Sequence, residues 1–412
     1  MPTRIYVTLF CLLLSFFETL ATERIVKVNR KNLKHFYSLI AKFTSGEKVC
    51  LITNQSASGQ LLLIPGESSN SSYLEETFSK NNVKIIKLLT PEHGLSSLEE
   101  VEDKKSKTTA SSKYELMSLY NKPVVEIQKL LHNCTDILFD LPDAGIRPYT
   151  YRTILTRTLN AVATMKDKPQ YMLIDRPNPA AYLGTYGPLT KKEQYSFLGE
   201  DSIAFFPGYT YAEISRRYIS QQNLDIKIVL FTMDNYYTKK TPDQSIVLPP
   251  SPNLPDDRAL HCYWIGIFLE GSNLDYGRNS NDPFCTFGHR DIDYRRPLPN
   301  INGVRIVPFQ YKASAGKFSN KQLKGYRIIA IDLHKFDPIE AAYTLYSYFI
   351  ETYPDLDIFY KYSKGTYKID LLTGSKVLRL HLQSRKRYII LKRKFEKQMM
   401  KFKQSMESYR LY

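Results

Sequence analysis

Short apolar runs alternate with longer amphipathic segments between about residues 29 and 233. A run of four to eight apolar residues is typical of a buried strand, and its alternation with helix-length segments is typical of βαβ units. The pattern therefore predicts an α/β fold built on a mostly parallel sheet. The expected strands are Val49–Thr53, Val83–Leu89, Asp136–Asp140, Tyr171–Asp175 and Ile226–Met233, and the expected helices are Asn32–Phe43, Tyr151–Met165 and Tyr211–Gln222.

A proline-rich segment, Leu248–Pro255, interrupts this pattern and enforces an extended path. It predicts a boundary between a sheet domain at residues 22–248 and a second domain at residues 249–412. The second domain holds strand-like runs around Tyr326–Asp332 and a terminal amphipathic helix. In that helix the apolar positions recur at helical spacing, at Leu391, Phe395, Met399, Phe402, Met406 and Tyr409.

The remaining face of the terminal helix is rich in lysine and arginine. Such a face is either a membrane-surface or polyanion patch, or a charged face that is merely solvated. Two other polar stretches, Gly66–Ser72 and Lys104–Lys113, are expected to form surface loops.

Residues 1–21 have the pattern of a secretory signal peptide. Arg4 precedes the apolar run Ile5–Phe17, and Thr19-Leu20-Ala21 resembles a small-residue cleavage site. We expect an exported protein, periplasmic or secreted, whose mature chain begins near Thr22; the alternative is a buried helix or a membrane anchor. No later segment reaches about 18 uninterrupted apolar residues, so no integral membrane segment is expected after cleavage.

The net charge of the chain indicates which kinds of partner it favours. The chain has 57 Lys and Arg against 41 Asp and Glu, a formal net charge of +16. This favours anionic partners. No nucleic-acid-binding signature is present, and an acidic carbohydrate polymer suits an exported basic protein better; general lysine enrichment is the alternative.

Cysteine and histidine spacing predicts no metal site. Outside the leader, Cys50, Cys134, Cys262 and Cys285 lack the spacing of zinc ligands, and the seven histidines are scattered. One or two disulfides are permitted outside the cytoplasm, but Cys50 and Cys134 lie in or beside apolar runs, so we expect buried free thiols.

The candidate chemistry follows the strands. Glu92 and His93 come directly after a strand, in Pro91-Glu92-His93-Gly94, where Glu92 can face a cleft at the carboxyl edge of the sheet. A partly buried glutamate there is suited to act as a general acid, with His93 supporting it. The alternative is a turn-stabilising glutamate beside a surface histidine.

Polar clusters follow the other strands as well. Arg147 can pair with a carboxylate, either that of a ligand or that of Asp143, and Tyr149 and Tyr151 can stack on a sugar. Two later segments, the proline-rich Leu248–Pro255 and the Gly/Asn-rich Glu270–Ser280, add further polar side chains. The full set of further candidates is Asn54, Asp143, Arg147, Tyr149, Tyr151, Asp175, Arg176, Asn178, Asn253, Asn273 and Arg278.

Several enzyme classes lack their signatures. The chain has no GxGxxG after its first strand and no GxxxxGK[ST], so the usual phosphate cradles of nucleotide-binding proteins are missing. It also has neither a GxSxG elbow nor an HExxH motif.

At these loops the sequence resembles the NamZ-like exo-β-N-acetylmuramidases, which are glycoside hydrolases. The resemblance runs through the chain after the leader. The motifs that carry it are Leu51–Gln55, Pro91–Gly94, Asp143–Tyr151, Asp175–Pro179, Pro249–Pro255, Glu270–Arg278, Asp370–Ser375 and Tyr409–Tyr412.

The resemblance implies a Rossmann-like catalytic domain and a smaller α+β auxiliary domain, with the active site in the cleft between them. It implies removal of terminal N-acetylmuramic acid (MurNAc) from the non-reducing ends of peptidoglycan fragments, without a cofactor. Glu92 corresponds to the catalytic glutamate. Asp143 and Glu213 are candidates for the second catalytic group, participation by the substrate's own N-acetyl group is a third route, and Arg147 and Arg176 are expected to contact the lactyl carboxylate of MurNAc.

The chain also departs from the family pattern. Leu95-Ser96-Ser97 stands where relatives have an aromatic residue or leucine followed by Arg-Gly, and Pro207–Glu213 lacks a histidine that relatives have. Tyr276 stands where an acidic residue is common. These departures keep open a second hypothesis, a peptidoglycan-binding protein that retains the cleft with weakened or no turnover.

Overall fold

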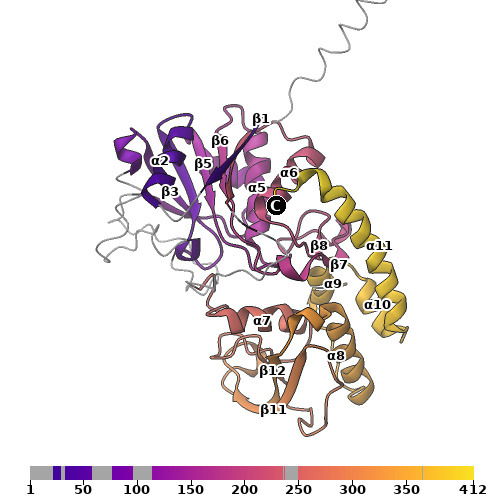
Figure 1. Ribbon diagram of the computed structural model, residues 1–412. Coiled ribbons are helices and arrows are strands. Elements are labelled where there is room, and N and C mark those ends of the chain that lie inside the picture. The colour runs from indigo at the N-terminus through magenta and orange to yellow at the C-terminus, as the bar shows by residue number, and fades with distance from the viewer. Residues whose placement is uncertain are drawn as a thin grey trace, which may run out of the picture.

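A computed structural model describes residues 22–28, 33–57, 77–95, 114–234, 236, 249–363 and 365–412. The predicted leader and the two predicted surface loops, Gly66–Ser72 and Lys104–Lys113, lie outside these residues. The described chain forms a sheet unit, residues 22–234, and a C-terminal unit, residues 249–412 (Figure 1). The helices that the structure describes include none long and apolar enough to cross a bilayer.

The sheet unit is built on seven parallel strands in the order β1-β9-β6-β5-β2-β3-β4. The hydrophobic pattern predicted a mostly parallel sheet and five of these strands, but it did not predict β1, β4 or the strand order. These strands are β1 (Thr22–Val28), β2 (Lys48–Thr53), β3 (Lys84–Thr90), β4 (Glu115–Ser118), β5 (Asp136–Asp140), β6 (Gln170–Ile174) and β9 (Lys227–Met233). The chain reverses its direction of progress across the sheet between β2 and β5. In open α/β sheets such a reversal opens a crevice at the carboxyl ends of the strands, where ligands bind.

Side chains of the central strands alternate between two apolar layers. In β5, Leu138 packs with α2 (Leu33–Phe43) on one face of the sheet. Its neighbours Ile137 and Phe139 pack on the other face, which is covered by α4 (Val124–Leu131), α5 (Tyr151–Ala163) and α6 (Tyr211–Gln222). Because both faces are covered, these strands are continuously apolar, and this is why they could be located in the sequence.

The C-terminal unit has its own antiparallel sheet and a set of helices. Its sheet has the order β10-β12-β11, from β10 (Thr286–Gly288), β12 (Gln322–Ala330) and β11 (Val304–Lys312). Its helices are α7 (Asp257–Gly266), α8 (Pro338–Thr352), α9 (Lys368–Thr373), α10 (Val377–Gln383) and α11 (Tyr388–Met406). Each unit also has one short two-stranded ribbon. The ribbon of the sheet unit pairs β7 (Tyr186–Leu189) with β8 (Ala204–Phe206), and that of the C-terminal unit pairs β13 (Lys361–Ser363) with β14 (Thr366–Tyr367).

Short 3₁₀ helices connect the longer elements. They are η1 (Gln55–Ala57), η2 (Ala181–Leu183), η3 (Lys192–Gln194), η4 (Ile267–Gly271), η5 (Gly316–Phe318), η6 (Leu333–Lys335) and η7 (Glu407–Tyr409).

The last helix, α11, returns to the sheet unit and packs against β7 and α6 (Figure 1). Its predicted apolar seam is buried at Leu391, Phe395, Met399, Phe402 and Met406. The end of the chain is then fixed to the sheet: the Tyr412 hydroxyl donates to Asp175 at 2.8 Å. The C-terminal helix therefore contacts both units. The predicted domain boundary at 248/249 assigns it to the second domain alone.

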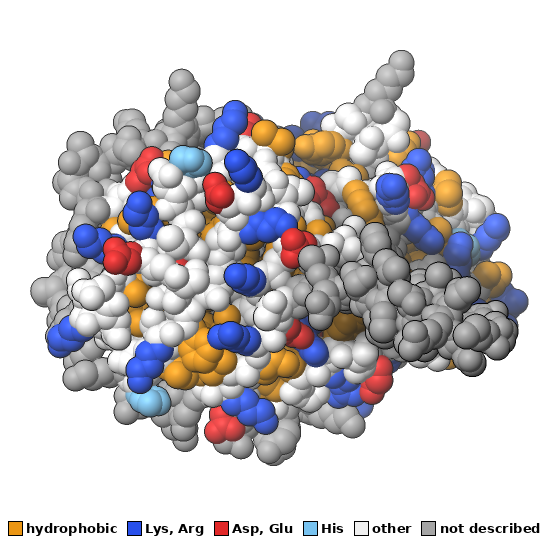
Figure 2. Space-filling model, turned by 90° about the horizontal axis from the view of Figure 1, so that it is seen from above, with side chains coloured by type: hydrophobic (Ala, Val, Ile, Leu, Met, Phe, Trp, Pro, Cys, Tyr) orange, Lys and Arg blue, Asp and Glu red, His pale blue; other side chains and the backbone are white. Residues whose placement is uncertain are grey.

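The face of the molecule in Figure 2 carries more basic than acidic side chains. This agrees with the formal net charge of +16. Large exposed apolar side chains are few among the described residues, and four of them lie between residues 380 and 400.

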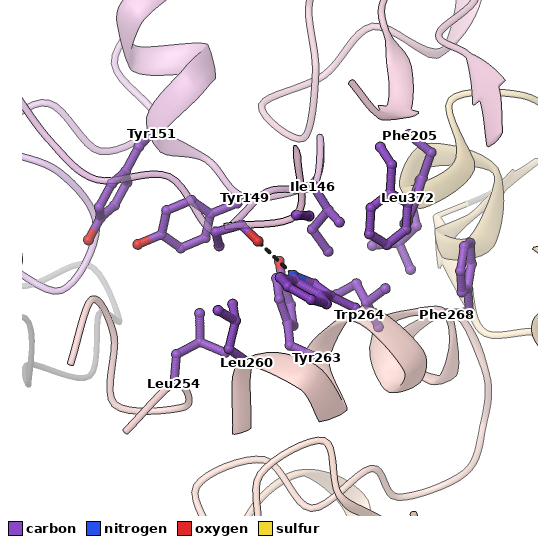
Figure 3. Packing of buried hydrophobic residues seen from close by; sticks show 14 of the residues in the cluster. Ile146, Tyr149, Tyr151, Phe205, Leu254, Leu260, Tyr263, Trp264, Phe268 and Leu372 are labelled. Atoms are coloured by element: carbon purple, nitrogen blue, oxygen red, sulfur yellow. Dashed lines mark hydrogen bonds between the residues drawn. The ribbon is translucent and has the colours of Figure 1, made fainter. Parts of the chain in front are cut away.

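An apolar cluster joins the two units (Figure 3). The loop after β5 contributes Ile146 and Tyr149, and α7 contributes Tyr263 and Trp264. The indole nitrogen of Trp264 donates to the carbonyl of Ala144 at 2.7 Å. The junction is therefore packed and hydrogen-bonded like a domain interior.

The expectation of buried free thiols is wrong. Cys50 is bonded to Cys134, and Cys262 is bonded to Cys285. Cys50 lies on β2, and Cys134 lies two residues before β5, the neighbouring strand. Sequence spacing could not reveal that pairing, because the two cysteines are 84 residues apart and only the sheet order brings them together.

Replacing Cys50 and Cys134 together by alanine should lower the free energy of unfolding by about 2–4 kcal/mol, because the bond restricts the unfolded chain. Urea denaturation of the variant and of the parent measures the loss. Mass spectrometry of non-reduced peptides should recover both cross-linked pairs. Recovery of all four cysteines as free thiols would contradict the pairing.

Candidate active site

The loop that carries Glu92 is a tight turn at the carboxyl end of β3. His93 and Gly94 both have positive φ angles, 71° and 70°. Glycine adopts such angles freely, whereas a histidine does so only where its surroundings hold it there. The loop is tied to the neighbouring β2 loop, since the Gln55 amide donates to the Leu95 carbonyl at 2.8 Å.

Glu92 is partly buried and held by its neighbours. Its side chain is 19% exposed, and Oε1 lies 3.9 Å from Nε2 of His93. The Thr150 hydroxyl, at the start of α5, donates to Oε2 at 3.1 Å. Partial burial raises the pKa of Tyr120 to about 12, aided by the charge of Glu92 and a hydrogen bond to it. The carboxylate is therefore positioned but still accessible, as a general acid or base must be.

The C-terminal unit brings further charged groups to Glu92. Burial lowers the pKa of Arg278, but Tyr276 and the carboxylates of Glu270 and Glu92 outweigh it and raise that pKa overall. Glu270 also pairs with Lys368 at 3.1 Å, and both side chains are largely buried. Glu92 of one unit thus interacts electrostatically with Arg278 of the other, which also interacts with Glu270.

Three carboxylates gather near the buried ring of Tyr263. The pKa of its hydroxyl is raised first by burial and then by the charges of Glu270, Glu92 and Asp143. Asp143 follows β5, and its Oδ1 accepts from the Gly145 amide at 3.0 Å. Burial raises the pKa of Asp143 to about 6. The predicted carboxyl edge therefore does bring Glu92 and Asp143 into one neighbourhood, with Glu270 added from the other unit.

Asn54, Tyr149 and Tyr151 form buried hydrogen bonds at the junction. Asn54 donates to the Tyr151 hydroxyl at 2.7 Å, and that hydroxyl donates to the Pro250 carbonyl at 2.7 Å. Tyr149 reaches the same carbonyl at 3.4 Å. The two rings lie within the apolar cluster (Figure 3), so their placement does not offer a face for stacking on a sugar.

The two arginines expected to bind substrate are already engaged. Arg147 is buried; it donates to Thr190 at 2.6 Å and to the carbonyl of Leu372 in the C-terminal unit. Burial, and then the charge of Arg152, lower the pKa of Arg147 to about 9. Arg176 makes a two-point contact with Asp140, at 2.6 and 3.0 Å. Both guanidinium groups therefore already have partners inside the protein.

Asp175, Asn178 and Glu213 hold α6 and the end of the chain. Asp175 accepts from the Ala212 amide at 3.0 Å, and Asn178 donates to the Tyr209 carbonyl at 2.8 Å. One oxygen of Glu213 accepts from the Thr210 amide at 2.9 Å and the other accepts from the Leu411 amide at 3.0 Å. Both carboxylate oxygens of Glu213 are thus used in a capping box and a tail contact.

Asn253 and Asn273 order loops of the C-terminal unit. Asn253 accepts from the Asn279 amide at 2.7 Å, next to Arg278, and Asn273 donates to the Asp357 carbonyl at 2.6 Å. Of the predicted binding residues, Arg278 is the one whose charge the structure places with Glu92. The substrate-binding roles that the sequence suggested for these residues and for the others from the polar clusters stay predictions.

Sequence reasoning missed Tyr120, Tyr263, Glu270 and Lys368 as site residues. Glu270 begins the polar Gly/Asn-rich segment Glu270–Arg278, and this composition was the one sequence feature that could have indicated its place in the site. Tyr120 and Lys368 lie in segments without a motif. In the part of the chain that the structure describes, no cluster of three or more His, Cys, Asp or Glu side chains could hold a metal ion.

Comparison with known families gives matches along nearly the whole chain. The family described as exo-beta-N-acetylmuramidase NamZ matches with its N-terminal profile at residues 49–258 and its C-terminal profile at residues 261–412. The peptidoglycan beta-N-acetylmuramidase NamZ of Bacillus subtilis strain 168 is 24% identical over 379 residues, covering 90% of this chain and 88% of that protein.

Two solved structures, both of DUF1343 family proteins from Bacteroides fragilis NCTC 9343, share the fold. The first has a TM-score of 0.74 at 23% identity and covers 92% of this chain and 97% of its own. The second has a TM-score of 0.65 at 19% identity and covers 90% of this chain and 95% of its own. The seven-stranded sheet with its appended C-terminal unit is thus an architecture found in related proteins.

Replacing Asp143 by asparagine should change how stability depends on pH. The folded-state pKa is raised to about 6, so ionisation opposes folding as pH rises from about 4 to 6, and the penalty is constant above that range. The free energy of unfolding of the variant relative to the parent should therefore rise by about 1–3 kcal/mol between pH 4 and pH 7. Urea denaturation at several pH values measures it, with the exposed Asp167→Asn as a control; a pH-independent difference would contradict the assignment.

Proposed function

Because the chain belongs to the exo-beta-N-acetylmuramidase NamZ family, we propose that it is an exo-acting glycoside hydrolase that removes terminal MurNAc from the non-reducing ends of peptidoglycan fragments, in cell-wall turnover and recycling. One observation carries the proposal. Glu92 is a partly buried carboxylate at the carboxyl edge of the sheet, oriented by Thr150 and near charged groups of the C-terminal unit.

In the proposed reaction Glu92 is the general acid and base. Its proton goes to the glycosidic oxygen as the bond to the anomeric carbon breaks, and Glu92 then accepts a proton from the incoming water. Oε2 is oriented by the Thr150 hydroxyl, so Oε1 is the oxygen we assign to the leaving group. His93, whose imidazole lies 3.9 Å from Oε1, supports that orientation.

We assign the second carboxylate role to Asp143 rather than Glu213. Both oxygens of Glu213 accept backbone hydrogen bonds that hold α6 and the chain end. Asp143 shares the surroundings of Tyr263 with Glu92, and its pKa of about 6 leaves it mostly ionised at neutral pH. An ionised carboxylate there can attack the anomeric carbon or orient the N-acetyl group of the substrate, while Glu92 takes the proton of the attacking water.

We assign recognition of the lactyl carboxylate to Arg278. The sequence favoured Arg147 and Arg176, but their guanidinium groups already pair inside the protein. Arg278 is only partly buried and lies with Glu92 and Glu270, while Lys368 neutralises Glu270 at 3.1 Å. A partly exposed cation beside the acid can pair with the substrate anion, and such a pairing favours MurNAc over an uncharged sugar.

We also propose that the protein is exported. The apolar run Ile5–Phe17 after Arg4 supports a leader, and two disulfides suit an oxidising compartment.

Replacing Glu92 by glutamine should lower kcat on a chromogenic MurNAc β-glycoside by about 10²–10⁴-fold, because glutamine cannot donate the proton. The exposed Glu126→Gln variant is a matched control and should keep the parent's kcat. Equal and negligible turnover by the parent and the Glu92→Gln variant, with muropeptide binding retained in both, would favour the binding-protein hypothesis instead.

Replacing Arg278 by glutamine should raise KM for the MurNAc glycoside by about tenfold or more, since a charge-assisted contact with the lactyl group is lost. The same variant should change KM little for the corresponding N-acetylglucosamine glycoside, which has no carboxylate. A parallel loss on both substrates would contradict the assigned role and indicate a general effect on the site.

A further inference from the structure

Half of the formal net charge of the chain lies in nineteen residues near its C-terminus. Residues 385–403 contain nine basic residues and one acidic residue, Glu396, against a formal net charge of +16 for the whole chain. The basic residues are Arg385, Lys386, Arg387, Lys392, Arg393, Lys394, Lys397, Lys401 and Lys403. Neither the fold nor the proposed site accounts for this concentration.

The described residues neutralise almost none of this charge. Lys392 lies 3.8 Å from a carboxylate oxygen of Asp337. For the other eight cations, the described residues provide no carboxylate within 4.0 Å. These eight side chains are exposed. Like charges held together on one helix repel each other, and an anionic partner relieves this repulsion. Binding of such a partner to this face is therefore electrostatically favourable.

The same region exposes apolar side chains that its helix does not need for packing. Leu380, Ile389, Ile390 and Met400 are 45–59% exposed, and they are four of the ten large exposed apolar residues among those described. The inner face of α11 is formed by a separate set at helical spacing, from Leu391 to Met406. Ile389 and Met400 lie on the opposite side of the helix, with Arg393 and Lys397 between them along the same face.

We propose that this outer face of α10 and α11 binds the surface of an anionic lipid bilayer. We define it by Leu380, Ile389, Ile390 and Met400 with the eight unpaired cations. Charge alone would equally suit a soluble acidic polymer. The exposed apolar side chains favour lipid, because they can enter the boundary between headgroups and acyl chains while the cations contact phosphate groups.

The arrangement of the molecule is compatible with such docking. In Figure 1, α11 runs along the outer side of the molecule, and among the described residues its inner face packs against β7 and α6. None of the residues of the outer face takes part in the contacts described around Glu92. Binding to a bilayer can therefore hold the protein at a membrane without engaging those catalytic contacts.

Co-sedimentation with vesicles tests the proposal on the full chain. The protein should bind vesicles containing about one-third phosphatidylglycerol and should not bind pure phosphatidylcholine vesicles, and salt at about 0.5 M should weaken the binding strongly. The triple variant Arg393→Glu, Lys397→Glu, Lys401→Glu should bind the anionic vesicles at least about tenfold more weakly. Lys129→Glu, Lys166→Glu, Lys227→Glu makes the same change in net charge on exposed lysines of the sheet unit and should retain binding.

A second variant separates lipid from polymer. Ile389→Ser with Met400→Ser should weaken vesicle binding while leaving any binding to soluble polyglutamate unchanged. Both sets of substitutions should leave hydrolysis of a soluble MurNAc glycoside as it is in the parent, which also reports that the fold is intact. The proposal is overturned if anionic vesicles are not bound at low salt, if the two triple variants lose binding equally, or if the serine variant binds vesicles as the parent does.

Discussion

The structure depends on the contact between the loop after β5 and the C-terminal unit. Backbone carbonyls in that loop and in α9 are buried outside any sheet ladder, so side chains must satisfy them. Trp264 of α7 donates to Ala144 across the junction, and Arg147 donates in the opposite direction to Leu372. These reciprocal bonds, set in an apolar cluster, fix how the two units face each other.

The site follows from that constraint. Glu92 and Asp143 belong to the sheet edge, whereas Glu270 and Arg278 belong to the C-terminal unit, and Tyr263 on α7 lies near three of these carboxylates. A change that loosened the junction would therefore separate the proposed acid from the proposed substrate-binding cation. Residues such as Arg147, which at first resemble ligands, contribute by holding the site together.

The sheet could be predicted from the sequence because its central strands are apolar on both faces. Strand ends located Glu92 and Asp143 correctly at one edge, since parallel strands place their carboxyl ends together. The sequence could not reveal which polar side chains make hydrogen bonds within the protein and which remain available to a substrate. Asp175 accepts from the Ala212 amide of α6 and from the Tyr412 hydroxyl, which is 237 residues away in sequence. Glu213 accepts from the Leu411 amide, which is 198 residues away. The cysteine pairs and Lys368 were hidden for the same reason, because partners distant in sequence decide their roles.

We propose that Glu92 meets the glycosidic oxygen at a site shared by both units. A crystal structure of the Glu92→Gln variant with a bound disaccharide, MurNAc linked to N-acetylglucosamine, tests it most directly. The glycosidic oxygen should lie about 2.6–3.2 Å from the side-chain amide of residue 92, with the lactyl carboxylate against Arg278. A disaccharide bound with its glycosidic oxygen far from residue 92, or contacting only one of the two units, would contradict it.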